Sequence, residues 1–351
     1  MNFDKLALNP IFFTSQKKED FLTDAIEELA ENNKLTDYLE ACRDGSKGTF
    51  SKPMKMIFGK IHSLLDAGVP LSLSIAGYFS PANQLLIETG EKNNNTAEGL
   101  KSALEINKAK DKLVSIFVAQ TFHPAYMFLM ALAFSALFGI MVIPNFTLAG
   151  VQVENMGKSF IFSYYLWNVV AHYSWLIFIA LVSFISLSIW SLKNWHGPSR
   201  DIADKFLPHY IIYKQFQAAY LLIVISALIR NNETASEAIS AIKKFSNPYL
   251  DYHLDRFESS LENGVKISQS LDTGLFASDF ISRLARYQKN NRENDLLKNT
   301  GTQSFDRMAR SVERAMGLVG NLIMLSAIGL IAWLGFDMAS MALVMRDVLI
   351  R

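Results

Sequence analysis

The side chains able to do acid-base or nucleophilic chemistry are scattered along the sequence. No two histidines have a His-x3-His spacing, and the one cysteine, Cys42, has no Cys or His neighbour of the kind that metal sites need. A nucleotide-driven enzyme would carry a Gly-rich loop ending in Lys-Ser or Lys-Thr, and the sequence contains none; GLVG at 317–320 falls inside a predicted membrane span. The sequence therefore predicts no catalytic residue, no metal site and no cofactor, and we expect a protein that is not an enzyme.

Two groups of charged residues are candidates for contact with a partner. Glu88 and Glu91 are three residues apart near a helix end, so both carboxylates face one side and could bind a cation or a basic partner. A second group has enough positive charge for an acidic partner or lipid headgroups, and it comprises Arg283, Arg286, Lys289 and Arg292. For each group a solvated helix surface is the competing interpretation.

Three polar residues, Asn168, His172 and Asn321, lie inside long apolar stretches. Polar residues in a membrane helix mark a proton or solute path or a contact between helices, so we treat these three as candidate intramembrane contacts. His172 is near one end of its stretch, where hydrogen bonding or water is the competing explanation.

Composition indicates that part of the chain lies in lipid. The 351 residues are 50% hydrophobic and their mean hydropathy is +0.16, which is high for a cytosolic protein. The formal charge of +1 gives no bias toward nucleic acid. Three stretches, 125–143, 166–190 and 317–336, are long and apolar enough to cross a hydrocarbon core of about 30 Å. We expect these to be transmembrane helices.

The positive charges predict the orientation of these spans. Lys and Arg number 14 before the first span, one between the first and second, 17 between the second and third, and two after the third. By the positive-inside rule, the N-terminal segment 1–18 and the regions 19–120 and 205–310 are cytoplasmic, whereas the loop 144–165 and the tail 337–351 lie on the other side. The first residues lack the features of a cleaved signal peptide, which agrees with a cytoplasmic start.

The two cytoplasmic regions resemble each other. Residues 30–41 align with 229–241 at a spacing of 199, which places Asn32 over Asn231, and Gly68 falls over Gly264 at a spacing of 196. Each region reads as six helices separated by Asn-Asn, Gly-Val and Pro or Ser turns, and the glycine should end a helix in a left-handed conformation. The predicted fold is an all-α membrane protein with two repeated cytoplasmic six-helix bundles and three transmembrane helices.

Several motifs, taken in order, resemble the type II secretion system F and type IV pilus inner-membrane platform family. They are LLDAGVPL at 64–71, FSPANQLLIETGE at 79–91, FHP before the first span, IPNF at 143–146, the stretch 195–239 that begins WHGPSRDIADKF, and LENGVKISQSLDTGLF at 261–276. The family often places a glycine three residues after its Gly-Glu pair, whereas here KNNNTAE separates that pair from Gly99, and the second copy has no Gly-Glu pair. In these features the chain is similar to the platform proteins of type IVb pili.

The resemblance implies a multi-pass platform of the bacterial inner membrane, with its N-terminus in the cytoplasm and its C-terminus in the periplasm. Such a protein would form homo-oligomers and would couple a cytoplasmic secretion or pilus ATPase to the polymerisation of pilin subunits. Other inner-membrane assembly proteins and the lipid bilayer would be its remaining partners, with no nucleic acid. The alternative left open is a small membrane transporter or channel subunit, because polar residues interrupt the spans.

Overall fold

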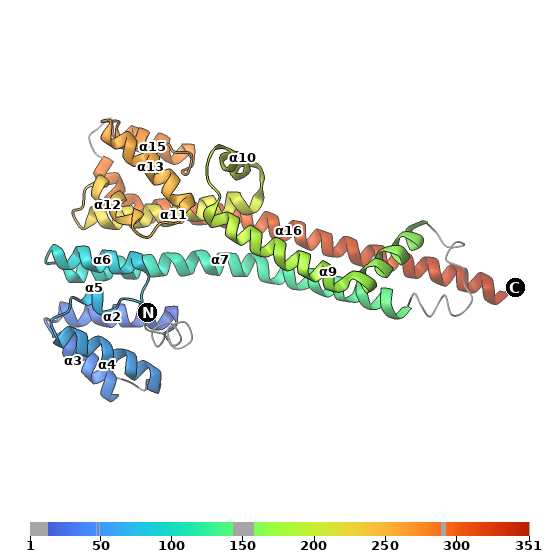
Figure 1. Ribbon diagram of the computed structural model, residues 1–351, viewed down its shortest axis with the longest axis horizontal. Helices are drawn as coiled ribbons and strands as arrows, with labels where there is room; N and C mark the ends of the chain where they lie inside the picture. Colours follow the sequence, from blue (N-terminus) through green and yellow to red (C-terminus); the bar gives the residue numbers. More distant parts are fainter. Residues whose placement is uncertain (1–12, 47, 49, 143–157, 289–292, 351) are drawn as a thin grey trace. The chain divides into compact units, whose positions relative to one another are not determined.

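The computed structural model describes residues 13–46, 48, 50–142, 158–288 and 293–350. In this part of the chain every named element is a helix, and the one isolated β-bridge joins Ala76 and Phe79 (Figure 1). The predicted all-α class is confirmed, whereas the division into two repeated six-helix bundles stays an interpretation. The chain forms two compact units: unit 1 is Met1–Ser115 with Asn194–Val312, and unit 2 is Ile116–Lys193 with Glu313–Arg351.

The first helical segment of unit 1 has an aromatic core. Phe13 meets Phe21, Phe58 and Phe79 with ring centroids 5.5 to 6.3 Å apart, and all four rings are buried. Edge-to-face contacts of this kind favour fixed ring positions beyond the burial of area alone. The helices that supply this core are α2 (Ser15–Ala30), α3 (Leu35–Asp44), α4 (Lys52–Asp66), α5 (Leu71–Ser74), α6 (Pro81–Lys92) and the start of α7 (Thr96–Leu137).

The second helical segment repeats this order of long and short helices and adds one helix before it. The added helix is α10 (Pro198–Phe206), which the sequence analysis did not predict. The others are α11 (Pro208–Arg230), α12 (Ala235–Lys243), α13 (Pro248–Glu262), α14 (Ile267–Ser270), α15 (Ser278–Gln288) and the start of α16 (Glu293–Ile350).

The turns give the register between the two segments. Gly68 and Gly264 follow α4 and α13 with φ of 79° and 72°, as the sequence predicts for a left-handed helix end. The sequence alignment places Asn32 over Asn231. In the structure the left-handed residues of the two Asn-Asn turns are Asn32 and Asn232, with φ of 60° and 69°. The spacing at this turn is therefore 200 and not 199, since the turn geometry and not residue identity decides which asparagine takes the left-handed position.

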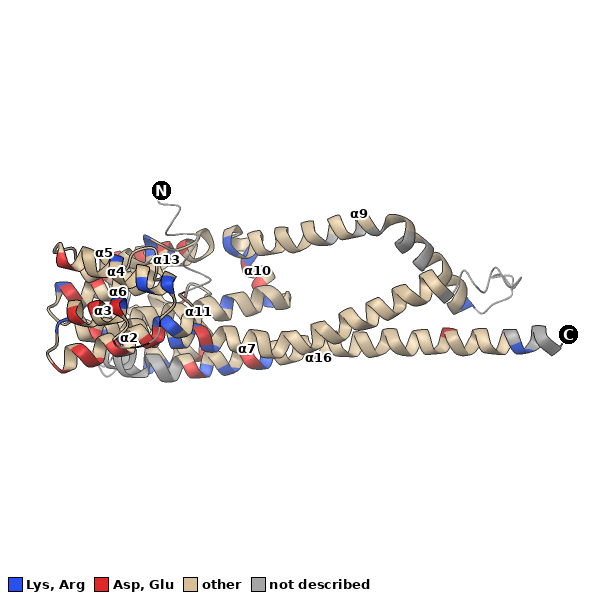
Figure 2. Ribbon diagram, turned by 90° about the horizontal axis from the view of Figure 1, so that it is seen from below, with Lys and Arg blue, Asp and Glu red and all other residues tan. Residues whose placement is uncertain are grey.

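Unit 2 contains the rest of α7 and α16 together with α9 (Lys158–Asn194), which includes the predicted span 166–190 and deviates from helical geometry at Tyr173. Residues 158–165, expected in a loop, are already helical, and 337–350 of the expected tail continue α16, while 144–157 lie outside the described residues. Phe138–Val142 form a π-helix at the end of α7. Among the coloured residues of α9 in Figure 2, Lys and Arg lie at the ends of the helix.

Among the described residues, three helices are long and apolar enough to cross a membrane: Thr96–Met141, Pro208–Arg230 and Phe305–Val344. The number of helices agrees with the prediction, but one of them is α11, which was not predicted to be a span. The predicted span 166–190 does not qualify by itself. Its second half, Phe178–Asn194, qualifies only together with Pro198–Phe206, and the two helices are bent relative to each other. The most apolar window of α11 is 56% buried, against 17% for the other two. A helix that is apolar all round can equally be a buried core helix, so we interpret α11 as part of the core of unit 1.

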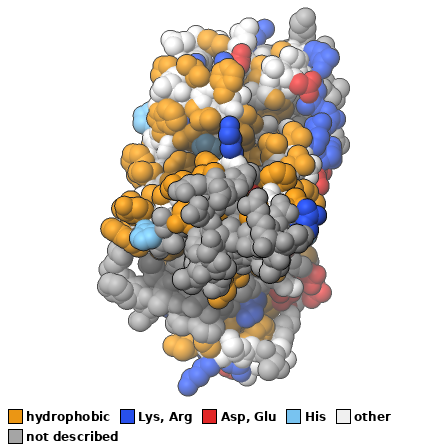
Figure 3. Space-filling model, turned by 90° about the vertical axis from the view of Figure 1, so that its right-hand side faces the viewer, with side chains coloured by type: hydrophobic (Ala, Val, Ile, Leu, Met, Phe, Trp, Pro, Cys, Tyr) orange, Lys and Arg blue, Asp and Glu red, His pale blue; other side chains and the backbone are white. Residues whose placement is uncertain are grey.

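The exposed surface of unit 2 is apolar. Phe178, Phe184 and Leu318 are exposed to more than three-fifths of their area, as expected for side chains that face lipid. Hydrophobic side chains are also abundant among the coloured residues on the face seen in Figure 3.

Within unit 2, α7 and α16 approach closely at one point. Pro124 lies inside α7 and has no N–H, so the Gln120 carbonyl loses its usual helical donor. A Cβ added to Gly320 of α16 would lie 2.7 Å from that carbonyl oxygen and 3.2 Å from Pro124 Cγ. Only a glycine fits here, as in other close contacts between membrane helices.

Candidate functional site

The carboxylate of Glu91 is engaged inside unit 1. It accepts hydrogen bonds from the backbone N–H of Leu71 at 2.6 Å, and from the N–H and hydroxyl of Ser72 at 3.3 and 2.6 Å. These groups are at the start of α5, so Glu91 satisfies donors that this short helix leaves free. The neighbouring candidate Glu88 forms a surface ion pair of 2.6 Å with Lys92. Glu91 therefore accepts hydrogen bonds inside unit 1, whereas Glu88 forms a surface ion pair. Contact of either carboxylate with a partner stays a prediction.

The glycines around Glu91 set the crossing of α6 and α7. A Cβ on Gly90 would meet the Cα of Gly99 at 2.8 Å, and a Cβ on Gly99 would meet the Leu86 carbonyl oxygen at 2.7 Å. Both contacts are to backbone atoms, which cannot move aside as a flexible side chain would. The Gly-Glu pair and the later Gly99 thus form a hairpin of two closely packed helices, which accounts for this motif structurally.

The positively charged group on α15 is only partly described. Arg283 pairs with Asp279 one turn earlier at 3.0 Å, and Arg286 is exposed. Lys289 and Arg292 lie outside the described residues. A docking role for this group stays a prediction.

Two of the three polar residues predicted inside the spans have described side chains. His172 and Asn321 lie at exposed positions of α9 and α16, and the side chain of Asn168 lies outside the described part of the chain. Their intramembrane contacts remain a prediction.

A buried charged cluster in the second segment was not anticipated. Arg200 of α10 is fully buried, and its Nε donates to Asp204 Oδ1 at 2.9 Å. The hydroxyl of Tyr249 on α13 donates to the other oxygen of Asp204 at 2.8 Å. The guanidinium lies over the ring of Tyr210 at 3.8 Å from the centroid, a cation-π contact. The cluster fastens the polar face of α10 to α11 and α13.

His253 lies beside this cluster in one defined tautomer. Its Nδ1 is 3.1 Å from the Thr273 carbonyl oxygen, which can only accept, so Nδ1 carries the proton and Nε2 has a free lone pair. Nε2 is buried and makes no hydrogen bond within the described residues. Burial lowers the pKa of His253 to about 4, with the nearby Arg256 acting in the same direction, so the ring is neutral at pH 7. Burial also raises the pKa of the Asp204 carboxyl.

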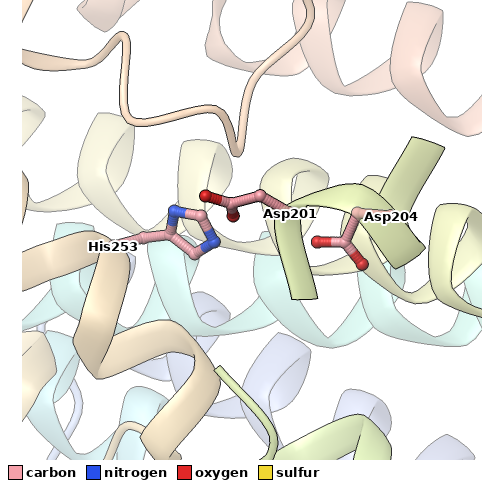
Figure 4. Close-up of side chains that lie close together, drawn as sticks. All are labelled: Asp201, Asp204 and His253. Carbon is pink, nitrogen blue, oxygen red and sulfur yellow. The ribbon is translucent and has the colours of Figure 1, made fainter. Parts of the chain in front are cut away.

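Asp201, Asp204 and His253 together offer three donor atoms within 4.8 Å of one another (Figure 4). Each carboxylate already has a positively charged partner: Arg200 forms an ion pair with Asp204, and Arg256 lies 4.0 Å from Asp201. A divalent ion would add two further charges to a buried site whose charges are already balanced, at a large desolvation cost. The geometry therefore favours a structural role over metal binding.

A cavity of about 20 Å³, lined by apolar and a few polar side chains, lies within unit 2. Asp337, fully buried, accepts a hydrogen bond from Ser163 of α9 at its wall. Ser135 Oγ and Trp333 Nε1 are buried there without a hydrogen bond to any described residue. The cavity has room for one water, which could accept from Trp333 and donate to Asp337. The lining residues are Ser135, Ser163, Leu166, Leu330, Trp333, Leu334 and Asp337.

Several polar contacts join the two helical segments of unit 1, and Arg230 makes two of them. Arg230, at the end of α11, lies 3.1 Å from Glu98 and 2.5 Å from Glu105, both on α7. Asn93 Nδ2 also donates to the Asn231 carbonyl at 2.7 Å. A guanidinium held between two carboxylates fixes the orientation of the arginine side chain better than a single ion pair does.

Comparison with known proteins gives two matches. Residues 21–144 match the family described as type II secretion system (T2SS), protein F. The chain is also 22% identical over 322 residues to toxin coregulated pilus biosynthesis protein E of Vibrio cholerae serotype O1, which covers 87% of this chain and 90% of that protein. The first match includes α2 to α7, where the Gly-Glu hairpin lies, and the second extends over both segments.

Proposed function

We propose that the chain is a member of the type II secretion system protein F family and serves as the inner-membrane platform of a type IV pilus machine, coupling a cytoplasmic ATPase to pilin polymerisation. The observation that carries this proposal is the similarity over most of both chains to a protein named for pilus biosynthesis. A type II secretion role is the closest variant of the same function, because the matched family is named for that system.

The architecture supports a transmitting and not a catalytic protein. Unit 1 offers the surfaces of two helical segments, linked by the ion pairs of Arg230, to a cytoplasmic ATPase, and the helices α7 and α16 run from unit 1 into unit 2. A continuous helix is stiff over this length, so a displacement of unit 1 would reach the membrane through these two elements. The proposal places the N-terminus in the cytoplasm and the C-terminus in the periplasm, with several copies in each machine.

The first experiment is co-purification of the detergent-solubilised full chain with each candidate secretion ATPase. Two charge reversals identify the docking segment. Glu88→Lys changes a half-buried residue of the first segment, and Arg286→Glu changes an exposed residue of the second. Neither alters the internal contacts of Glu91. Specific capture that one reversal abolishes would support the proposal and identify the docking segment. Failure to capture any ATPase, together with solute flux in vesicles of the purified protein, would favour the transporter alternative.

A second experiment tests transmission. Insertion of a short glycine run after Ser115, where unit 1 ends on α7, should abolish pili while membrane insertion persists. An alanine run of the same length keeps the helix continuous and is the matched control. Wild-type piliation with the glycine insertion would contradict force transmission through α7.

A further inference from the structure

The helix α10 has its polar and apolar faces reversed relative to a helix on a water-exposed surface. Its buried side carries Arg200 and Asp204, the fully buried ion pair. Its outward side carries Ile202 and Phe206, which are 61% and 77% exposed and lie one turn apart. A surface helix in water normally turns its charged residues outward and its apolar stripe inward.

The reversal is built into the cluster that holds α10. Arg200 and Asp204 are bonded to each other, and Tyr249 and Tyr210 hold them from α13 and α11. Rotating α10 to hide Phe206 would bring the bonded pair out and leave the Tyr249 hydroxyl without its acceptor. The apolar face is therefore fixed in its exposed position, and something apolar must cover it.

The chain itself indicates what covers this face. The end of α9 at Asn194 is separated from the start of α10 at Pro198 only by Trp195, His196 and Gly197. The Cα atoms of Asn194 and Pro198 are therefore within about 14 Å of each other. The last turns of α9 expose Ile189 and Trp190, at 54% and 63%. The lipid-facing surface of α9 thus ends within reach of α10.

Charged and aromatic residues around this junction have the composition of a membrane-water boundary. Lys193 is exposed at the end of α9, and Lys205 is exposed on α10, next to Phe206 in the chain. Exposed lysines next to an apolar stripe attract anionic headgroups, and tryptophans such as Trp190 and Trp195 prefer the interfacial depth.

We propose that α10 is an interfacial membrane helix, whose Ile202 and Phe206 enter the boundary between headgroups and acyl chains at the end of α9. Lys205 contacts anionic lipid headgroups from the rim of this face. The charged cluster of Arg200 anchors the other side of α10 in unit 1, so the helix ties unit 1 to the bilayer surface.

The test measures the depth of single nitroxide labels on the full chain in lipid nanodiscs of phosphatidylethanolamine and phosphatidylglycerol. The labels are attached to Ile202→Cys and Phe206→Cys in a Cys42→Ala background, which removes the one native cysteine. Met56→Cys is the matched control, because Met56 of α4 is 62% exposed and also lies in unit 1. Ile185→Cys, on the apolar part of α9, is the lipid reference.

The labels at 202 and 206 should show a several-fold higher ratio of oxygen to nickel-complex accessibility than the label at 56, and should approach the label at 185. Nickel accessibility equal to that at 56 would place α10 in water and overturn the proposal. Low accessibility to both reagents would mean that protein, either another copy or unit 2, covers the face, and would also overturn it. Because both altered residues are exposed, their substitution should leave the unfolding temperature near that of the Cys42→Ala chain.

Discussion

The two helical segments of unit 1 share an order of helices but are held together by different forces. The first has a core of edge-to-face rings around Phe13 and a hairpin in which Gly90 and Gly99 touch. The second also buries apolar side chains such as Leu222 and Phe257, but it adds a charged cluster, in which Arg200 and Asp204 are buried with the neutral ring of His253 beside them. The same succession of helices can therefore be stabilised by apolar packing alone in one place and by apolar packing with an added buried ion pair in another. The stability of the second segment should therefore depend on pH and on intact charge pairing more than the stability of the first.

The largest effect should come from unpairing the buried charge of the second segment. Asp204→Ala leaves the Arg200 guanidinium buried without its carboxylate and removes the acceptor of Tyr249. We expect a loss of about 3–5 kcal/mol of unfolding free energy, measured by denaturant unfolding in detergent. The double variant Arg200→Met with Asp204→Leu is the control and should recover most of the loss. An equal loss in both variants would mean that volume and not charge holds the site.

The next effect distinguishes the segments by pH. His253 has a pKa of about 4 when folded, against about 6.5 in an unfolded chain. Between these values the unfolded state binds a proton that the folded state does not, so stability is complete above pH 6.5 and falls as the pH drops toward 4. The expected loss is about 3 kcal/mol over this window. Comparing the pH dependence of unfolding in His253→Asn and the natural chain isolates this contribution, and identical slopes would contradict it.

A smaller effect tests the shape-based first segment. Gly99→Ala places a Cβ 2.7 Å from the Leu86 carbonyl oxygen, so α6 and α7 must separate, at a cost of about 1–3 kcal/mol. Gly59→Ala in α4 is the control, because its Cβ would meet the flexible side chain of Arg43, whose Cδ would be nearest at 3.4 Å. That control should be neutral or stabilise by up to about 1 kcal/mol through helix propensity. Thermal unfolding of both variants decides the comparison.

The smallest effect separates two glutamates of similar sequence context. Glu91→Gln weakens the charge-assisted bonds to the start of α5 and should cost about 1–2 kcal/mol. Glu88→Gln removes a surface pair with Lys92 and should cost no more than about 0.5 kcal/mol. Denaturant midpoints of the two variants measure the difference, and equal midpoints would show that the cap of α5 contributes nothing.

Much of the fold could be predicted from the sequence, because proline, glycine and asparagine mark the helix ends. Pro81 and Pro248 begin helices, and Gly68 and Gly264 follow helix ends in the left-handed conformation. The one-residue error at Asn32 arose because an Asn-Asn pair offers two residues that tolerate this conformation, and only the chain geometry selects one.

The buried polar residues could not be predicted in the same way. Arg200 and Asp204 are four apart, a spacing that the sequence reads as a solvated surface pair, and nothing local indicates that Tyr249 covers them. Asp337 follows directly after the apolar run 317–336, so it reads as the start of a polar tail, although it is fully buried. In both cases burial is decided by helices that are distant in sequence, such as α13 and α9.

The glycine pair of α16 also gives the helix contact at Pro124 a direction. Gly317 and Gly320 are three residues apart, and a Cβ on Gly317 would come no nearer than 3.7 Å to Gln120 Oε1. If α16 slid about one turn toward its C-terminus, Gly317 would replace Gly320 against the Gln120 carbonyl. Sliding the other way would bring Ile323 or Met324 into a space that does not admit even a methyl group. The contact should therefore resist axial displacement of α16 along α7 more strongly in one direction than in the other.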